Sequence, residues 1–259
     1  MNNISIGFIG GGRITKILLQ GWKRVGKLPA QVVVMDLNSD MLERLKKDFP
    51  TIKITVNDPK LPAECDVVFI ALHPPALVDT IRAIKPIIKP STGIVSLAPK
   101  IKIVKIAEIL PECKNIVRIN PNAPSIVNAG YNPMAFSKSI GETEKKTVVD
   151  LFRLLGDCPE VPEELLEAFA MTTAMGPTYF WFQIFELQEL AKSFGIPEDI
   201  LKDAIPKMVI GTVKTITESG MTQTEVMDLI PVKPLVEEEP IIKEFYQKKL
   251  NALYKKLKG

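Results

Sequence analysis

Three consecutive glycines lie between an apolar run and a helix-like run near the start of the chain, in GFIGGGRIT at residues 7–15. Gly10 and Gly12 occupy the first two positions of a G-x-G-x-x-G pattern, and Thr15 occupies the third. Between a strand and a helix, this pattern is typical of dinucleotide binding. Gly10 would allow the tight turn, and Gly12 would let a pyrophosphate approach the N–H groups at the start of the helix. The alternative is a glycine turn that holds no ligand.

One carboxylate supports the same interpretation. Asp36 ends the apolar run QVVVMD, 24 positions after Gly12. A carboxylate there can accept hydrogen bonds from both ribose hydroxyls of NAD and repel the 2′-phosphate of NADP. Residues 37–39 include no cation to receive that phosphate, and Arg13 is the one cation nearby. We therefore expect NAD(H) to be favoured over NADP(H), with simple helix capping as the alternative role of Asp36.

Alternating strand and helix patterns must position these residues. We expect strands at 4–9, 31–36, 51–56, 65–72, 93–98 and 115–119, and helices at about 14–25, 39–49, 75–88 and 102–110. This alternation predicts an α/β fold with a parallel sheet and helices on both faces. After about residue 160 the spacing is helical almost throughout, over 163–173, 177–194, 198–218, 223–229 and 238–258. The sequence thus predicts a Rossmann dinucleotide-binding domain at 1–160 and an all-helical domain at 161–259.

Composition argues against several function classes. The 33 basic and 30 acidic residues give a net charge of +3, which is too balanced to indicate nucleic acid or an anionic membrane as a partner. No apolar run is long enough to span a bilayer, and we see no secretory signal. Cys65, Cys113 and Cys158 are far apart and odd in number, which favours free thiols in a reducing cytoplasm. With a single histidine and no paired cysteines, a transition-metal site is not expected.

The chain resembles the pyrroline-5-carboxylate reductase family in four stretches: GFIGGGRIT, FIALHPP at 69–75, IVRINPNAPSIVNAGYNPMAF at 116–136 and AMGPTYFWFQIFELQELAKSFGIP at 174–197. The element from Arg118 to Pro124 is the most specific of these. The likeness follows the same order along nearly the whole chain. It implies a Rossmann domain followed by a helical dimerisation and substrate domain. It also implies hydride transfer from a nicotinamide to a cyclic imine, at a site where the nicotinamide of one subunit meets helices of its partner.

The resemblance also implies roles for individual residues. The pyrophosphate would be held by Gly10, Gly12, Arg13 and Ile14, the adenosine ribose by Asp36 and Asn57, and the nicotinamide end by Ala71, Leu72, His73 and Pro74. Asn122, Ala123 and Pro124 would face the nicotinamide and the substrate. His73 and Asn122 are the catalytic candidates. The alternatives are a loop histidine packed on its neighbouring prolines and an asparagine that serves turn chemistry.

Two stretches depart from the family pattern. Its Gly-Ser-Gly-Pro is Ala-Met-Gly-Pro here, which places Met175 at the expected substrate site. Its Ser-Pro-Gly-Gly-Thr-Thr loop, which grips the substrate carboxylate, is replaced by LIPVKPLVEEE at 229–239. Pro231 and Pro234 remove two backbone donors, and Lys233 could supply a point charge instead.

We therefore expect a cytoplasmic NAD(P)H-dependent reductase that transfers hydride to a small cyclic imine or a related carbonyl compound. A homodimer or larger homo-oligomer would form through the C-terminal helices, where Tyr179 to Phe185 includes an aromatic band. One alternative is a non-catalytic sensor or assembly subunit that binds NAD(H) on the same fold. Another is a related reductase of a different substrate class.

Overall fold

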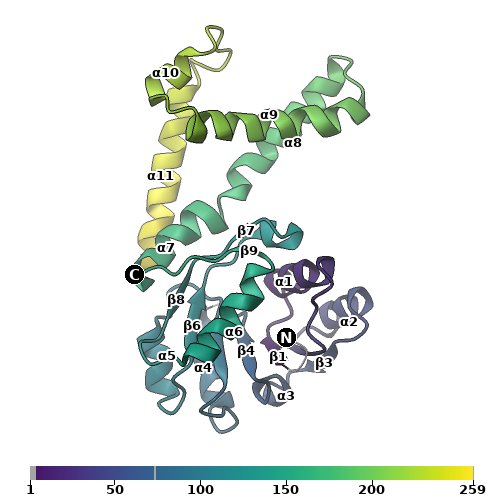
Figure 1. Ribbon diagram of the computed structural model, residues 1–259, viewed down its shortest axis with the longest axis vertical. Helices are drawn as coiled ribbons and strands as arrows, with labels where there is room; N and C mark the ends of the chain where they lie inside the picture. The colour runs from purple at the N-terminus through teal and green to yellow at the C-terminus, as the bar shows by residue number, and fades with distance from the viewer. Residues whose placement is uncertain (1–3, 73, 259) are drawn as a thin grey trace. The chain divides into compact units, whose positions relative to one another are not determined.

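A computed structural model describes residues 4–72 and 74–258 (Figure 1). The chain divides into two compact units, Met1–Met175 with Tyr254–Gly259, and Gly176–Leu253. The first unit contains the strands and the helices that cover them, whereas the second is helical. The structure confirms the predicted α/β fold, with a Rossmann-like N-terminal domain and a helical C-terminal region.

In the part of the chain that the structure describes, a seven-stranded sheet forms the centre of the first unit, in the order β3-β2-β1-β4-β5-β6-β8. Its strands are β1 (Ser5–Ile9), β2 (Gln31–Asp36), β3 (Lys53–Val56), β4 (Val67–Ile70), β5 (Gly93–Ser96), β6 (Ile116–Ile119) and β8 (Met134–Phe136). All of these pair in parallel except β8, which is antiparallel to β6. The strand order reverses between β1 and β4, and folds of this type bind ligands outside the carboxyl ends of such strands.

Helices cover both faces of the sheet (Figure 1). Apolar side chains of α1 (Arg13–Arg24), α2 (Ser39–Asp48) and α6 (Glu142–Arg153) build the core on one face, and those of α3 (Lys60–Ala63), α4 (Pro74–Ile84), α5 (Ile103–Ile109) and α7 (Leu166–Phe169) build it on the other. The rings of Phe8 and Phe69 stack at the centre of the first core, with their centroids 4.8 Å apart. All four residues of β4 are buried, which explains why this strand reads as a continuous apolar run.

Several elements between residues 120 and 160 were not predicted from the sequence. They are the 3₁₀ helix η1 (Ala123–Val127), the strand β8, the helix α6 and the two-stranded pair of β7 (Gly130–Tyr131) with β9 (Gly156–Asp157). The strands have only two or three residues each, which is too short for a recognisable alternation. Helix α6 begins with the polar run ETEKKT, so its buried side chains lie only in its second half.

The helical region begins with a segment of mixed geometry. It consists of the 3₁₀ turn η2 (Glu163–Leu165), α7 and the π-helical turn η3 (Ala170–Ala174). This segment belongs to the first compact unit, although the sequence places the change of pattern near residue 160. Its contacts with the end of β6, described below, account for that assignment.

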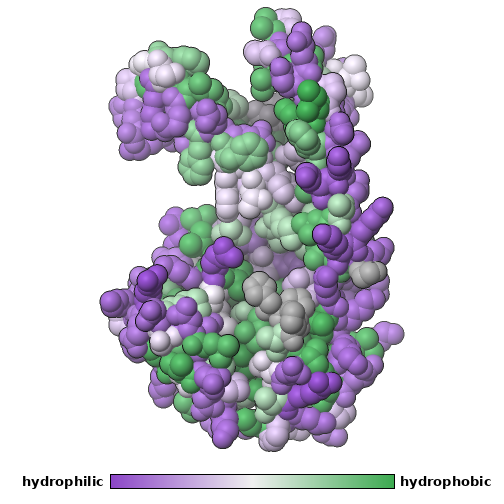
Figure 2. Space-filling view, turned by 180° about the vertical axis from the view of Figure 1, so that it is seen from behind, coloured by the Kyte–Doolittle hydropathy of each residue, from purple (hydrophilic) through white to green (hydrophobic). Residues whose placement is uncertain are grey.

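The second unit contains α8 (Pro177–Ser193), α9 (Glu198–Glu218), α10 (Gln223–Asp228) and most of α11 (Glu239–Lys258). Its buried apolar cluster is small and is built on Ala191, Leu201 and Ile205. Many large apolar side chains therefore remain at its surface, and Figure 2 shows hydrophobic residues among the exposed side chains of the helices. No helix within residues 4–72 and 74–258 is both long enough and apolar enough to cross a membrane.

Candidate dinucleotide site

Gly10 is a glycine because the fold requires it. Its φ angle is +110°, a conformation that L-residues rarely adopt. A Cβ atom at this position would lie 2.5 Å from the backbone oxygen of Ala71, at the end of β4. The N–H of Gly10 donates to the carbonyl of Met35 at 2.8 Å, which ties the end of β1 to β2. The turn therefore lies against the ends of both neighbouring strands.

At Gly12, neither the backbone conformation nor the packing of the fold requires a glycine. Its φ and ψ angles of −70° and −165° are open to any residue, and no heavy atom lies within 4 Å of the position that a Cβ would take. Gly12 is the N-cap of α1, and no side chain caps that helix. The N-terminus of a helix attracts anions through its N–H groups and its dipole. An absent side chain here leaves room for an anionic group, such as a pyrophosphate, to approach the start of α1.

Thr15 takes the third glycine position without disturbing the turn. Its side chain is fully buried, and its hydroxyl donates to the carbonyl of Gly10 at 2.6 Å. This hydrogen bond therefore links the first turn of α1 to the first glycine of the loop. Arg13 and Ile14 begin α1, where Arg13 is exposed and Ile14 is half-buried.

Asp36 joins the glycine loop to the end of β2. Its Oδ2 accepts from the N–H of Gly11 at 2.7 Å, and its Oδ1 accepts from the N–H of Asn38 at 3.0 Å. The N–H of Asn57 donates to the carbonyl of Asp36 at 3.0 Å. An ionised carboxylate has about four acceptor positions, so Asp36 retains capacity for ribose hydroxyls. The alternative role considered for Asp36 is helix capping. The N-cap of α2 is instead Asn38, whose side chain accepts from the N–H of Met41.

A pocket of about 380 Å³ adjoins Asp36. It is lined by Met35, Asp36, Leu37, Asn57, Pro59, Leu72, Ala76, Asp79, Thr80 and Ala83. The structure thus brings together Asp36, Asn57 and Leu72, three of the residues that sequence reasoning selected. It adds Asp79 and Thr80 from α4, which that reasoning missed because they belong to no motif. None of the described lining residues is basic.

Asn122 lies at the start of η1 and is buried. Its Oδ1 accepts from the N–H of Tyr131 at 3.0 Å, and its Nδ2 donates to the carbonyl of Thr173 at 3.3 Å. Its own N–H donates to Oδ1 of Asn132 at 3.2 Å. The side chain of Asn122 therefore connects the loop after β6 to the π-helical turn η3. Ala123 and Pro124 follow it in η1 and are half-buried.

Of the remaining predicted site residues, Ala71 lies beside Gly10, and Leu72 lines the pocket with Asp36. Ala71 and Leu72 follow β4, and the N–H of Ala71 donates to the carbonyl of Ile9 at 2.9 Å. His73 lies outside the described residues, and α4 begins at Pro74. Met175 follows η3 at the end of the first unit. Lys233 belongs to the second unit and lines a separate pocket of about 370 Å³ with Met227, Pro234, Leu235, Val236 and Glu239.

Residues 5–100 match a family model described as NADP oxidoreductase, coenzyme F420-dependent. Over 217 residues the chain is 26% identical to pyrroline-5-carboxylate reductase 3 of Macaca fascicularis, covering 83% of this chain and 78% of that protein. It is also 24% identical over 231 residues to pyrroline-5-carboxylate reductase of Methanosarcina acetivorans, covering 89% and 85% of the two chains. The chain is thus similar to pyrroline-5-carboxylate reductases over most of its length, as the four sequence stretches predict.

A solved structure shares the fold over the whole length of this chain. The crystal structure of Plasmodium falciparum pyrroline carboxylate reductase with NADP bound has a TM-score of 0.82 and 23% identity, covering 100% of this chain and 98% of that one. Within the pyrroline-5-carboxylate reductase fold, the element Arg118–Pro124 occupies the end of β6 and the start of η1.

Proposed function

We propose that this chain is an NAD(P)H-dependent reductase that transfers hydride to a small cyclic imine. The open space beside Gly12 is the observation that carries the proposal, because neither packing nor backbone conformation requires a glycine there. A bound reduced nicotinamide would supply the hydride. The similarity to pyrroline-5-carboxylate reductases supports a C=N bond as the acceptor.

The chain's own residues would bind and orient the reactants. Gly10, Gly12 and the first residues of α1 would hold the pyrophosphate, and Asp36 with Asn57 would hold the adenosine ribose. Asn122 and Ala123 would orient the nicotinamide and the imine. An imine that enters already protonated needs no strong side-chain acid, so correct positioning can supply much of the rate enhancement.

We further propose that NADH is preferred over NADPH. The carboxylates of Asp36 and Asp79 both line the adenosine-side pocket, and no described lining residue is basic. A 2′-phosphate there would meet the carboxylate of Asp36, whereas the charge of Asp79 is partly balanced by Arg82, whose Nη1 lies 3.2 Å from Oδ1 of Asp79. The Plasmodium falciparum protein holds NADP in its structure, so this preference would distinguish the present chain from that relative.

We also propose that the helical domain, residues 161–259, pairs with a second copy of the chain in the cytoplasm. Phe180, Trp181, Phe182 and Phe185 of α8 are 45–66% exposed. Several large exposed apolar side chains on one helix are typical of an interface with another chain.

The first experiment is to follow the oxidation of NADH and of NADPH with pyrroline-5-carboxylate and pyrroline-2-carboxylate. The proposal expects turnover with at least one imine and a higher kcat/KM with NADH. A Gly12→Val variant is the matched control, because its larger side chain would fill the space assigned to the pyrophosphate. No turnover with either imine, despite tight NADH binding, would contradict the reductase proposal.

One observation favours a second candidate function. Segment 229–236 exposes Leu229, Ile230, Val232 and Leu235, and its one cation is Lys233. Such an apolar surface offers few hydrogen-bond donors for binding a small carboxylate. A non-catalytic NAD(H)-binding subunit would use the same cofactor site and bind NADH without reducing either imine.

A further inference from the structure

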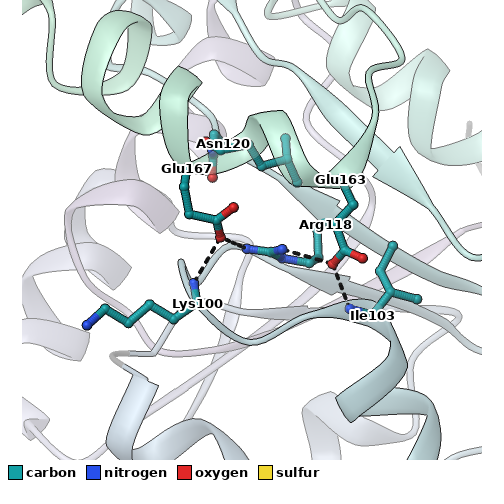
Figure 3. Close-up of polar contacts among 7 residues, drawn as sticks. Lys100, Ile103, Arg118, Asn120, Glu163 and Glu167 are labelled. Atoms are coloured by element: carbon teal, nitrogen blue, oxygen red, sulfur yellow. Dashed lines mark hydrogen bonds and ion pairs between the residues drawn. The ribbon is translucent and has the colours of Figure 1, made fainter. Parts of the chain in front are cut away.

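A buried charge cluster lies beside the end of β6 (Figure 3). Arg118 is 1% exposed, and its guanidinium contacts Glu163 at 2.8 Å and Glu167 at 2.7 Å. Oε1 of Glu163 also accepts from the N–H of Ile103 at 2.7 Å, and Oε1 of Glu167 from the N–H of Lys100 at 3.3 Å. One arginine thus holds two carboxylates that lie four residues apart, at the start of the segment 163–174. Because charged hydrogen bonds are strong when buried and directional, this cluster fixes the position of the segment.

Two further side chains extend the same contact. Asn120 follows Arg118 by two positions, and its Nδ2 donates to the carbonyl of Leu166. Asn122 follows by two more, and its Nδ2 donates to the carbonyl of Thr173. Alternate residues of an extended chain point to the same side. Residues 118, 120 and 122 therefore form one row along the segment 163–174. Arg118 bonds to Glu163 and Glu167, Asn120 to Leu166 of α7, and Asn122 to Thr173 of η3.

The segment that they hold has little regular structure of its own. It passes from a 3₁₀ turn through a single α-helical turn to a π-helical turn within twelve residues, 163–174. Turns of this kind are short and rare, and π-helical turns occur frequently at functional sites. Helices this short depend on tertiary contacts for their stability. Residues 118, 120 and 122, at the end of β6 and in the loop after it, supply such contacts, and Met175 follows the segment directly.

We infer that Arg118 and Asn120 are positioning residues that place the π-helical turn against Asn122. This inference rests on the proposed function, because Asn122 and Ala123 are the residues assigned there to the nicotinamide and the imine. The side chains of Arg118 and Asn120 are bonded to the segment 163–174, and we assign neither of them a contact with a reactant. Both act by keeping the Thr173 carbonyl within reach of the Asn122 amide, which fixes the rotamer of that amide and the position of Met175.

Asn120 allows the sharpest test, because the same strand offers a matched control. Asn115 stands just before β6, is 6% exposed, and donates from Nδ2 to the carbonyl of Pro90 at 3.3 Å. Asn115→Leu and Asn120→Leu each remove one buried amide that bonds a backbone carbonyl, at opposite ends of β6. Oδ1 of Asn115 also accepts from the N–H of Gly141 at 3.1 Å, so Asn115→Leu should cost at least as much stability as Asn120→Leu. Only Asn120→Leu releases the segment 163–174.

Steady-state kinetics and hydrogen exchange by mass spectrometry would be measured on both variants and on Arg118→Lys. We expect Asn120→Leu to lower kcat with the imine at least tenfold while the Kd of NADH stays within twofold. The amides of 163–175 should exchange at least tenfold faster in this variant, and those of β1 and α1 should not. Arg118→Lys, which keeps the charge but cannot bridge both carboxylates, should change both readouts in the same direction. Asn115→Leu should keep kcat within twofold and leave exchange in 163–175 unchanged.

Equal losses of kcat in the two asparagine variants would overturn the inference, as would faster exchange in 163–175 with unchanged kcat. If the unmodified protein binds NADH but reduces neither imine, the proposed function fails. The positioning role of Arg118 and Asn120 is then tested by measurements that need no turnover. Exchange in 163–175 and the fluorescence emission of bound NADH then serve as the readouts. A change of both in Asn120→Leu, and of neither in Asn115→Leu, would support the positioning role. Any other pattern would overturn it.

Discussion

The carboxylate of Asp36 accepts a hydrogen bond from the backbone N–H of Gly11, with Oδ2 2.7 Å from the nitrogen. The residue assigned to the cofactor's ribose is therefore hydrogen-bonded to the loop assigned to its pyrophosphate. A change at Asp36 acts on both, so its effect on cofactor binding should exceed the loss of one ribose contact.

Asp36→Asn is the first prediction. An amide has one acceptor oxygen, so one of the N–H groups of Gly11 and Asn38 would lose its acceptor, and the other would keep only a neutral one. We expect the Kd of NADH to rise at least tenfold, because a hydrogen bond to a charged group contributes about 1.5–3 kcal/mol and tenfold corresponds to about 1.4 kcal/mol. The Kd of NADPH should change less, because the repulsion of its 2′-phosphate is also reduced. Fluorescence titration with both nucleotides would measure this.

Asp40→Asn is the control for charge alone. Asp40 lies in the first turn of α2 and is exposed. It should leave both dissociation constants within twofold. An unchanged ratio of NADPH to NADH affinity in Asp36→Asn would contradict the assignment of Asp36 as the residue that selects NADH.

The second prediction compares two glycines of one loop. Gly10→Ala should destabilise the protein by about 2–4 kcal/mol, because the φ of +110° is strained for alanine and its Cβ would lie 2.5 Å from a backbone oxygen. Gly12→Ala should change the free energy of unfolding by less than about 1 kcal/mol, because its conformation is ordinary and the space is open. It should nevertheless weaken NADH binding at least tenfold. Urea denaturation and NADH titration of both variants test the contrast.

A Gly12→Ala variant that binds NADH normally would remove the main support for a pyrophosphate at this position. A Gly12→Ala variant as unstable as Gly10→Ala would instead mean that the glycine serves the fold. The two measurements therefore separate a role in folding from a role in binding.

The sequence predicted the sheet and the helices well where their patterns are long. Strand β2 was predicted with its observed bounds, Gln31–Asp36, because its apolar run is continuous and turn residues surround it. The helices α8 to α10 were also predicted closely, since glycine and proline mark their ends. Strand β8 was missed because three residues, held by antiparallel pairing with β6, carry no local pattern.

Only the part of the candidate site that belongs to the glycine motif, residues 10–15, could be predicted from residue spacing. The roles of Gly10 and Gly12 follow from their spacing, but only the structure separates a glycine required by backbone strain from one that faces open space. Asp79 and Asn120 carried no signal in the sequence. Asp79 lines the pocket because α4 packs beside the end of β2, and Asn120 meets Leu166 across 46 positions of chain. Such long-range contacts depend on the fold and not on local spacing.

The third prediction concerns self-association. Phe182 and Phe185 of α8 are 66% and 64% exposed. A glutamate at either position would place a charge in the proposed interface, where desolvating it is costly. We expect Phe182→Glu and Phe185→Glu to shift the protein from dimer to monomer at micromolar concentration, measured by size-exclusion chromatography with light scattering.

Val104→Glu provides the control for a new surface charge. Val104 lies on α5 of the first unit and is 61% exposed, a similar fraction. This variant should assemble as the unmodified protein does. A monomeric unmodified protein at 100 times that concentration would contradict the proposed pairing.

The last prediction concerns pH and the Cys65 thiol. Burial, assisted by the charges of Asp66 and Glu64, raises its pKa from 9.0 to about 11, although a hydrogen bond with Ser5 opposes the shift. The unfolded chain loses this proton near pH 9, whereas the folded chain keeps it to about pH 11. The folded state thus binds more protons in this window, so the free energy of unfolding should fall as the pH rises from 9 to 11. At about 1.4 kcal/mol per pKa unit, the contribution of Cys65 to this fall is about 2–3 kcal/mol.

Other groups titrate in the same range, so the difference between the unmodified protein and Cys65→Ala isolates the thiol. At pH 7.5 the variant should be less stable by about 1–2 kcal/mol, because it loses a buried sulfur. That difference should shrink or reverse by pH 11, because only the unmodified protein carries the thiol. Urea denaturation at pH 7.5, 9, 10 and 11 measures both curves. Parallel curves across the whole range would mean that the environment of Cys65 does not favour the neutral thiol.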